Sequence, residues 1–472
     1  MQKTLFYLIT TILFLTFNTS LTSGQQYQTE HTGFTHFDPT IVDGHVDTMM
    51  KVIDEDTWLP KINIGENTAF ELDIPKAQAG GINAPFFAAY TSGYYGNNPR
   101  SISETLALIN ALYWTEEQNP EDFKIATTTG EIRRAITDKQ IAAIPSIEGA
   151  YSLEKHNAIG LLHQYNDLGI RMIGFNWNFS NALGEGADEV YGNPERTPSE
   201  GGLTAIGAEV AEEMNRIGMI IDVSHMSRNT FWDVIEISEA PILASHSGVN
   251  ALKDHQRNLT DEQLLALKEN GGVISIVFYP AFITDNATGF VSDVVDHIDY
   301  AVDLIGIDHV GLGSDFDGAT LPSDLENAAD MSRITEELII RGYTTQEIEQ
   351  ILGGNILRVM EEVEQASENE LFGSDSGLVI IPAYEMGEII DNRTPLLTAE
   401  IEEKKGITLD KDSFKVIVDG VSYDELNFDE EASKLSLQLT EELQERFHMV
   451  TFEVADMEGG VTRETRIFYI GD

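Results

Sequence analysis

Eight short apolar segments recur between about residues 40 and 365 of this chain, most of them separated by a polar loop and an amphipathic helix. Continuous apolar strands that alternate with helices are typical of a parallel sheet buried on both faces. Eight is the number of strands in a (β/α)8 barrel. We therefore predict an α/β fold of the TIM-barrel type, with a doubly wound open sheet as the competing arrangement. The expected strands are Ile41–Asp47, Ile82–Tyr90, Ile141–Ile147, Gly169–Asn176, Met219–Ser224, Pro241–His246, Val273–Phe278 and His309–Asp315. The clearest helices between them are expected at Ser101–Glu116, Ile206–Ile217, Asp261–Glu269 and Asp293–Leu304.

The alternation of strands and helices stops after about residue 365. Leu378–Glu388 is expected to run along the barrel, and a different pattern begins near Thr394. Four later segments alternate apolar and polar residues with turns between them, which is typical of a small all-β, immunoglobulin-like sandwich. These segments are Phe414–Val418, Lys434–Leu439, Met449–Val454 and Arg466–Ile470. We thus expect a barrel domain at residues 35–390 and a sandwich domain at residues 395–472.

The first residues have the composition of a secretory signal. Lys3 supplies the positive start, Leu5–Phe17 the apolar core and Asn18–Gly24 a small polar exit. That core is too short to span a bilayer comfortably, so a cleavable signal peptide at residues 1–24 is favoured over an uncleaved anchor. No second apolar stretch approaches transmembrane length. We expect a soluble mature protein that is exported to the periplasm or the extracellular space, with association to the cell surface as one option.

Charge and cysteine content exclude several classes of function. The formal net charge is −50 and the pI is about 4.3, which argues against a nucleic-acid partner because phosphate contacts need clustered Lys and Arg. The chain has no cysteine. Disulfides, thiolate zinc sites and cysteine nucleophiles are therefore excluded.

Ionisable side chains stand at the carboxyl ends of five of the eight expected strands. In a barrel these ends meet at one rim, where catalytic residues sit. His45 and Asp47 leave the first strand on the same face, because side chains along a strand alternate with a period of two. The other members of this set are Glu148, His225, His246 and Asp315.

Imidazoles and carboxylates without sulfur suit zinc, and also cobalt or manganese. The set contains enough ligands for two ions. His45 and Asp47 are expected to bind one ion. His225 and His246 are expected to bind the other, with Glu148 as the bridge. Two ions a few ångströms apart would hold a hydroxide between them and polarise a carbonyl.

Asp315 remains outside this ligand set and is the candidate proton carrier between the attacking water and the leaving amine. Each residue alone has an ordinary explanation: His225 by itself would more often be a satisfied core histidine, and His246 an ordinary residue of a strand end. Six such residues at strand ends are together poorly explained by accident.

Six motifs of the chain resemble, in order, those of the membrane dipeptidase (renal dipeptidase) family of zinc peptidases. They are Asp43-Gly-His-Val-Asp47, Ser146-Ile-Glu-Gly149, Asp222-Val-Ser-His225, Ser245-His-Ser247, His255-Gln-Arg-Asn-Leu259 and Gly311-Leu-Gly-Ser-Asp-Phe-Asp-Gly318. The resemblance extends from Ile41 to about Val359, roughly two-thirds of the chain. It implies a barrel hydrolase with two zinc ions that cleaves dipeptides. It also suggests a homodimer. This expectation comes from the resemblance alone, because no feature of the sequence indicates an oligomeric state.

The same resemblance implies the substrate contacts. Arg257 would bind the terminal carboxylate of the substrate with its planar guanidinium, beside Asn258. Tyr279 would contact the same carboxylate. One position departs from the mammalian members, which have a histidine after the fourth strand where this chain has Trp177. An indole can donate one hydrogen bond but accepts none. We expect this difference to affect which substrates are accepted more than whether hydrolysis occurs.

Three functions follow as hypotheses. The first is an exported dipeptidase in which a hydroxide bridging two zinc ions attacks the peptide bond. The second is hydrolysis of another amide, a lactone or a phosphoester on the same scaffold, because the barrel hosts many chemistries. The third is a non-catalytic protein that attaches to a surface through its C-terminal sandwich.

Overall fold

The computed structural model describes residues 39–93, 99–187, 201–367, 377–404 and 406–471. The expected signal peptide at residues 1–24 lies outside these ranges. No helix of the described part has the length and hydropathy that crossing a membrane requires.

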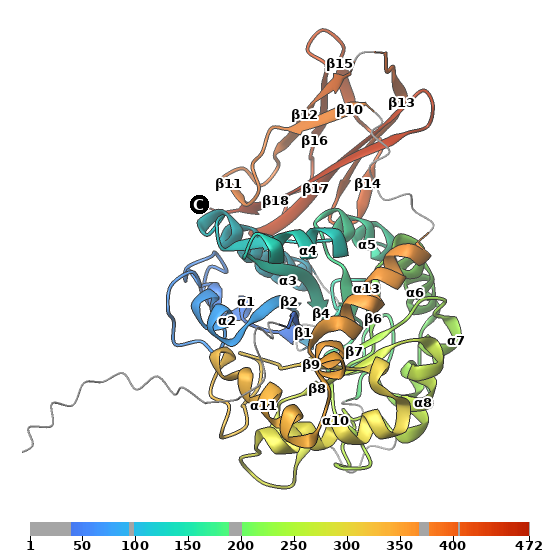
Figure 1. Ribbon diagram of the computed structural model, residues 1–472. Helices are drawn as coiled ribbons and strands as arrows, with labels where there is room; N and C mark the ends of the chain where they lie inside the picture. The colour runs from blue at the N-terminus through green and yellow to red at the C-terminus, as the bar shows by residue number, and fades with distance from the viewer. Residues whose placement is uncertain (1–38, 94–98, 188–200, 368–376, 405, 472) are drawn as a thin grey trace, which may run out of the picture. The chain divides into compact units, whose positions relative to one another are not determined.

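Eight parallel strands form a closed barrel (Figure 1). They follow one another in the order β2-β1-β9-β8-β7-β6-β5-β4, and pairing of β2 with β4 closes the ring. Their bounds are β1 Ile41–Val46, β2 Ile82–Tyr90, β4 Ile141–Glu148, β5 Met172–Gly174, β6 Ile220–Asp222, β7 Leu243–Ser247, β8 Val273–Val277 and β9 Val310–Gly313. Each lies in an expected segment or extends one residue beyond it, so the barrel prediction is confirmed and the open sheet was wrong. The three-residue strand β3, Phe123–Ile125, pairs with β4 outside the ring and is too short to leave a periodic pattern.

Helices surround the barrel (Figure 1). They are α1 Met49–Val52, α2 Ile74–Gly80, α3 Pro99–Gln118, α4 Thr129–Thr137, α5 Ala158–Asp167, α6 Ala205–Ile217, α7 Arg228–Ile237, α8 Asp261–Asn270, α9 Pro280–Ile283, α10 Val291–Ile305, α11 Ser332–Arg341, α12 Thr345–Glu349 and α13 Asn355–Ala366. The four expected helices correspond to α3, α6, α8 and α10. Local signals set their ends: the Thr204 hydroxyl accepts from the Gly207 amide at the start of α6, and Gly218 ends that helix with a left-handed φ of 73°.

The barrel core consists mainly of apolar side chains from the strands and from α4 and α13. Fully buried members include Val42, Phe86, Ile144, Leu243 and Ile356.

Close backbone packing joins three strands of the barrel. A Cβ atom on Gly313 of β9 would lie 1.8 Å from the Ser245 carbonyl oxygen of β7, and one on Gly44 of β1 would lie 2.7 Å from the same oxygen. Only glycine permits this approach. The carboxyl ends of β1, β7 and β9 are consequently brought together at the rim.

The C-terminal part is all β, as expected. It contains a four-stranded sheet, β10-β12-β16-β15, and a five-stranded sheet, β11-β18-β17-β13-β14. The bounds are β10 Leu378–Pro382, β11 Glu388–Ile390, β12 Leu396–Glu403, β13 Leu409–Val418, β14 Val421–Tyr423, β15 Asn427–Asp429, β16 Lys434–Gln438, β17 Arg446–Asp456 and β18 Val461–Ile470. Apolar side chains from both sheets, such as Leu397, Leu435, Phe452 and Phe468, form one buried core.

One expectation about this part was wrong. Leu378–Pro382 does not run along the barrel but pairs antiparallel with β12, from Leu378 opposite Glu403 to Pro382 opposite Ala399. Its short apolar run fits a barrel contact and a sheet strand equally well, and only the long-range pairing distinguishes the two.

Helix α5 contacts the five-stranded sheet through buried polar groups. The Gln164 side-chain amide donates to Thr451 Oγ1 at 2.9 Å, and its carbonyl accepts from the Gly420 amide at 2.6 Å. At the end of α5, Asp167 forms an ion pair with Arg463 of β18 at 2.9 Å, and both side chains are about nine-tenths buried.

Candidate metal centre

The rim residues converge because backbone hydrogen bonds join the ends of their strands. The Asp315 amide donates to the His45 carbonyl at 3.1 Å, and the Asp47 amide donates to the Phe316 carbonyl at 2.9 Å. These bonds fix the end of β1 beside the segment that follows β9. His45, Asp47 and Asp315 are all buried.

His45 lies at the centre of a first group of carboxylates. Its Nε2 is 3.6 Å from Asp47 Oδ1, 3.7 Å from Glu148 Oε2 and 4.0 Å from Asp315 Oδ1. Within the described ranges, His45 Nε2, Asp47 Oδ1 and Glu148 Oε2 are buried atoms without a hydrogen-bond partner. Each such atom costs about 1–3 kcal/mol if left unsatisfied. The separations are too long for hydrogen bonds, and a shared cation would satisfy all three atoms at once.

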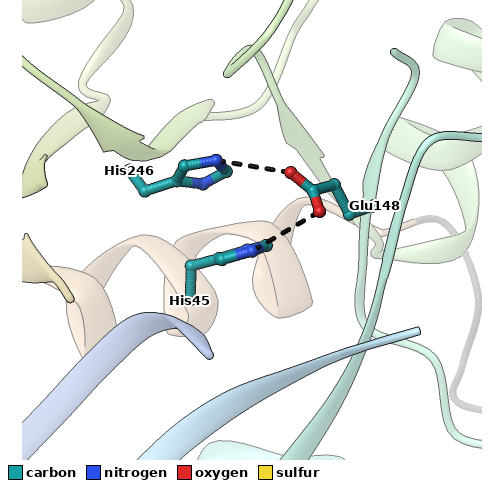
Figure 2. A group of neighbouring side chains, drawn as sticks. All are labelled: His45, Glu148 and His246. Atoms are coloured by element: carbon teal, nitrogen blue, oxygen red, sulfur yellow. Dashed lines mark ion pairs between the residues drawn. The ribbon is translucent and has the colours of Figure 1, made fainter. Parts of the chain in front are cut away.

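His225 and His246 form a second group with the other oxygen of Glu148. Their Nε2 atoms lie 2.8 Å apart, and Glu148 Oε1 is 2.9 Å from His225 Nε2 and 3.4 Å from His246 Nε2. Figure 2 shows one oxygen of Glu148 turned towards His246 and the other towards His45. The glutamate therefore stands between the two groups.

The two histidines of the second group are held neutral. Burial, together with the positive charges of Arg257 and His45, lowers the pKa of His225 and of His246 well below the usual value. A neutral imidazole is the form that binds a metal. This group thus matches the chemistry of a zinc, cobalt or manganese site.

The first group concentrates negative charge. Burial alone would lower the pKa of His45, but the charges of Glu148 and Asp47 outweigh it and raise that pKa to about 10. Burial also raises the pKa of Glu148 well above its usual range. Such a cluster attracts a cation, and a divalent ion there would favour the ionised carboxylates.

Asp315 belongs to the same cluster. Its carboxylate, His45 and Asp47 offer ligand atoms that all lie within 4.8 Å of one another. Burial, and then the like charge of Asp47, raise the pKa of Asp315 to about 7, although His45 opposes the change. A carboxyl group with this pKa can gain and lose a proton near neutral pH.

The expected substrate residues lie on two sides of the metal centre. On one side, buried Arg257 donates from Nη2 to the His246 carbonyl at 3.0 Å, and its guanidinium carbon lies 5.3 Å from the centre of the Phe282 ring. The Tyr279 ring packs edge-on against the same Phe282, with 4.8 Å between ring centres. Phe282 therefore contacts both residues expected at the substrate carboxylate.

The Asn258 side-chain amide is hydrogen-bonded to three backbone groups. Its side-chain oxygen accepts from the Gly248 amide at 2.9 Å, and its side-chain nitrogen donates to the carbonyls of Lys253 and Phe282 at 2.8 and 2.7 Å. These bonds use most of what a side-chain amide can form. We interpret Asn258 as a residue that holds the Arg257 loop rather than as a direct substrate contact.

Aromatic residues form the other side. The Trp177 ring lies 6.3 Å from the His225 ring, 5.2 Å from Tyr90 and 5.8 Å from Phe179, measured between ring centres. Trp177 therefore lies beside His225 of the second group. Tyr90 is the last residue of β2 and is in register with Glu148 of β4.

The family model of the membrane dipeptidases, peptidase family M19, matches residues 35–372. This chain belongs to the membrane dipeptidase family. It is accordingly a metallo-dipeptidase, a hydrolase that acts on peptide bonds. The family suggested by the six sequence motifs is confirmed.

Curated relatives and solved structures agree with this membership. The dipeptidase is 37% identical over 248 residues to an uncharacterised Klebsiella pneumoniae protein from the pqqA 5′ region, covering 51% of this chain and 89% of the relative. It is 32% identical over 311 residues to dipeptidase aclJ of Aspergillus oryzae, covering 63% of this chain and 71% of the relative. A metallopeptidase from Rhodobacter sphaeroides, solved with a phosphinate mimic of L-Ala-D-Ala, is 28% identical with a TM-score of 0.61, covering 69% of this chain and all of that one.

Tyr90 and Phe282 were not among the site residues expected from the sequence. Tyr90 could have been found, because it ends an expected barrel strand. Phe282 carries no chemical signal in the sequence. The contact between Asn178 and His225 was also not expected: Asn178 Oδ1 lies 2.8 Å from His225 Nδ1 across a separation of 47 residues.

Proposed function

We propose that this dipeptidase hydrolyses dipeptides with two Zn²⁺ ions bound at the barrel rim. The observation that carries the proposal is the position of Glu148. Its Oε2 lies 3.7 Å from His45 Nε2, whereas its Oε1 lies 2.9 Å from His225 Nε2. A carboxylate whose oxygens face two separate sets of ligands is the arrangement that a bridging residue needs.

His45 and Asp47 would hold one ion, and His225 and His246 the other, with Glu148 shared. The donors are nitrogen and oxygen only, so Co²⁺ or Mn²⁺ fits as well as Zn²⁺. When bound, such ions supply an acidified water and a polarised carbonyl.

Asp315 would move the proton. Its Oδ1 lies 4.0 Å from His45 Nε2 at the edge of the first group, where it can accept a proton from the attacking water. The same oxygen would then donate that proton to the nitrogen of the departing amino acid. The proton thus leaves the water and ends on the amine.

Arg257 would bind the terminal carboxylate of the substrate, with Tyr279 beside it. The guanidinium is kept in place by the His246 carbonyl and the Phe282 ring, so little conformational freedom is lost when a carboxylate binds. A carboxylate bound this close to the metal ligands leaves room for a single residue beyond the scissile bond, which favours dipeptides over longer peptides.

Trp177 and Tyr90 would face the substrate from the opposite side. Aromatic rings there favour an apolar substrate side chain over a charged one. The Rhodobacter metallopeptidase was solved with a mimic of L-Ala-D-Ala, so we include this L-D dipeptide among the proposed substrates.

The test is a substrate panel assayed with the full chain after two equivalents of Zn²⁺ are restored. The panel contains L-L and L-D dipeptides with apolar and charged side chains, a tripeptide, and an N-acetyl amino acid amide. We expect turnover of apolar dipeptides and little of the longer or blocked compounds. Two bound metals without turnover of any dipeptide would overturn the proposal. The second candidate function, favoured by Trp177, is hydrolysis of another amide, a lactone or a phosphoester. Adding those compounds to the panel shows whether any of them is hydrolysed in place of dipeptides.

We also propose, from the sequence, that residues 1–24 are a cleaved signal peptide of an exported protein and that the chain forms a homodimer. N-terminal sequencing of the protein from cell fractions tests the first point, and light scattering of the purified protein tests the second. Limited proteolysis tests the proposed division into two domains, with the boundary expected before Leu378, because β10 pairs with β12 of the C-terminal sheets.

A further inference from the structure

A buried chain of hydrogen bonds ends on His246. The Ser245 hydroxyl donates to Asp222 Oδ2 at 2.7 Å, and Ser245 Oγ lies 2.8 Å from His246 Nδ1. An ionised carboxylate can only accept, so it takes the hydroxyl hydrogen of Ser245. The serine oxygen is then left as an acceptor, and His246 must carry its ring proton on Nδ1.

Asp222 itself is fixed by the backbone. Its Oδ1 accepts from the Ser224 amide at 2.9 Å and from the Ser245 amide at 3.0 Å. Its Oδ2 consequently points towards the Ser245 hydroxyl. The side chains that form these hydrogen bonds are almost completely buried, so water does not compete for the bonds; they are Asp222, Ser245 and His246.

His225 has an outer partner of a different kind. Its Nδ1 lies 2.8 Å from Asn178 Oδ1, and a side-chain amide oxygen only accepts hydrogen bonds. His225 must therefore carry its ring proton on Nδ1 as well. Both histidines then direct a lone pair from Nε2 towards Glu148 Oε1, and the two Nε2 atoms are only 2.8 Å apart.

We propose that Asp222, acting through Ser245, and Asn178 are positioning residues that hold His246 and His225 in the Nδ1–H tautomer. Two imidazole nitrogens and one oxygen of an ionised carboxylate cannot hydrogen-bond to one another, because all three are acceptors, but they can all bind one cation. The inference rests on the proposed two-metal function. Asp222, Ser245 and Asn178 would affect only the ion at His225 and His246.

An isosteric change at Asp222 tests the proposal sharply. In Asp222→Asn the amide oxygen must stay where two backbone amides donate, which places the NH2 group opposite Ser245 Oγ. The serine oxygen now accepts, and its hydrogen turns to His246 Nδ1. The ring proton moves to Nε2 and blocks the metal position. Outer partners of metal-binding histidines typically contribute about 10–100-fold in affinity, so we expect a loss of that size for one of two Zn²⁺ ions.

A matched pair of variants tests Asn178. Its φ is 54°, a left-handed value that glycine adopts freely, so Asn178→Gly removes the acceptor without straining the backbone. Asn178→Asp keeps an acceptor oxygen at the same place. We expect Asn178→Gly to weaken one Zn²⁺ about 10–100-fold and Asn178→Asp to bind no more weakly than the wild type.

Ser275→Ala is the control for loss of a buried polar group. Ser275 is fully buried on β8, and its hydroxyl has no hydrogen-bond partner among the residues that the structure describes. We expect it to bind both ions as the wild type does.

The measurement is a Zn²⁺ titration of the full chain against a competing chelator, repeated with Co²⁺ to follow its absorption spectrum. Histidine ¹⁵N shifts of the metal-free chain report the tautomers of the wild type and of Asp222→Asn. A wild type that binds fewer than two ions would overturn the proposed function. If the wild type binds two ions and Asp222→Asn and Asn178→Gly bind them with the same affinities as the wild type, the positioning roles are overturned. They are also overturned if the variants weaken the binding of both ions equally.

Discussion

Three residues at the rim have backbone angles that side chains seldom adopt. The φ values are 65° for His225, 65° for Asp315 and 54° for Asn178. Asn, Asp and His are the types that tolerate this region best, yet each such residue costs about 1–3 kcal/mol. The conformation turns the chain sharply where a strand ends and aims the side chain back over the barrel. The rigid strands below hold these residues in place.

Replacement of Asp315 by Asn should remove the proton carrier and keep the metal site. Asn has the same shape and tolerates the left-handed backbone, but it cannot take up a proton. We expect kcat to fall about 10²–10⁴-fold while the metal content stays near that of the wild type. Steady-state kinetics beside elemental analysis measures both quantities. Activity within tenfold of the wild type at equal metal content would contradict the role of Asp315.

Gly318 leaves space for two carboxylates. A Cβ atom there would lie 2.1 Å from Asp47 Oδ2 and 2.6 Å from Asp315 Oδ1. Gly318→Ala should therefore displace both side chains. We expect binding of the ion that we propose His45 and Asp47 hold to weaken at least tenfold, and turnover to fall with it. Zn²⁺ titration checks this. Gly130→Ala on α4, where the nearest atom to the new Cβ is 3.9 Å away, is the control and should bind zinc normally.

The eight barrel strands could be predicted because each lies in a largely apolar segment, including β5 and β6, which have only three residues each. The strands β3 and β15 could not, since their three residues lie among polar residues and form no apolar run. The rim ligands followed from the barrel, because all strands end at one edge. The partners of those ligands did not: the contact between Asn178 and His225 depends on side-chain directions in two separate loops, which no local pattern encodes.

The turn between β13 and β14 contains a buried ion pair with β17. His448 Nδ1 lies 2.6 Å from Asp419 Oδ2, and its Nε2 lies 2.9 Å from the Gln444 carbonyl oxygen. Burial alone would lower the pKa of His448, but the charge of Asp419 outweighs it, so the pKa is raised. A raised folded-state pKa stabilises the protein fully below the unfolded value of about 6.5, and the stabilisation is lost as pH rises through the folded value.

His448→Gln should remove this pH dependence. We expect the wild type to lose stability relative to the variant as pH rises above about 6.5, measured as the difference in urea unfolding midpoints from pH 6 to 9. The difference between the two proteins isolates His448 from the other titrating groups. A difference that stays constant over this range would show that the imidazole does not carry the charge.

The buried contacts of α5 indicate that the C-terminal sheets stabilise the barrel. Arg463 pairs with both Asp167 of α5 and Glu453 of β17, at 2.9 and 2.6 Å. Removing the arginine would leave Asp167 buried without a cationic partner, whereas Glu453 would keep its ion pair with Lys415 at 2.7 Å. Such uncompensated charges are strongly destabilising, at about 3–5 kcal/mol.

Arg463→Leu should accordingly lower the free energy of unfolding by about 3–5 kcal/mol, measured by urea denaturation. Arg466→Leu removes a more exposed arginine that pairs with Glu464 on the same strand, and should cost less than about 1 kcal/mol. Equal effects of the two changes would argue against a stabilising role for the Asp167 contact.

We propose that two metal ions, which Glu148 would bridge, carry out dipeptide hydrolysis in the whole protein. Stepwise restoration of Zn²⁺ to the metal-free full chain, with L-Ala-D-Ala or an apolar L-L dipeptide as substrate, tests it most directly. We predict that turnover rises to its maximum at two bound ions per chain and that Glu148→Gln reaches neither that stoichiometry nor that rate. Full activity with a single bound ion, or none with two, would contradict it.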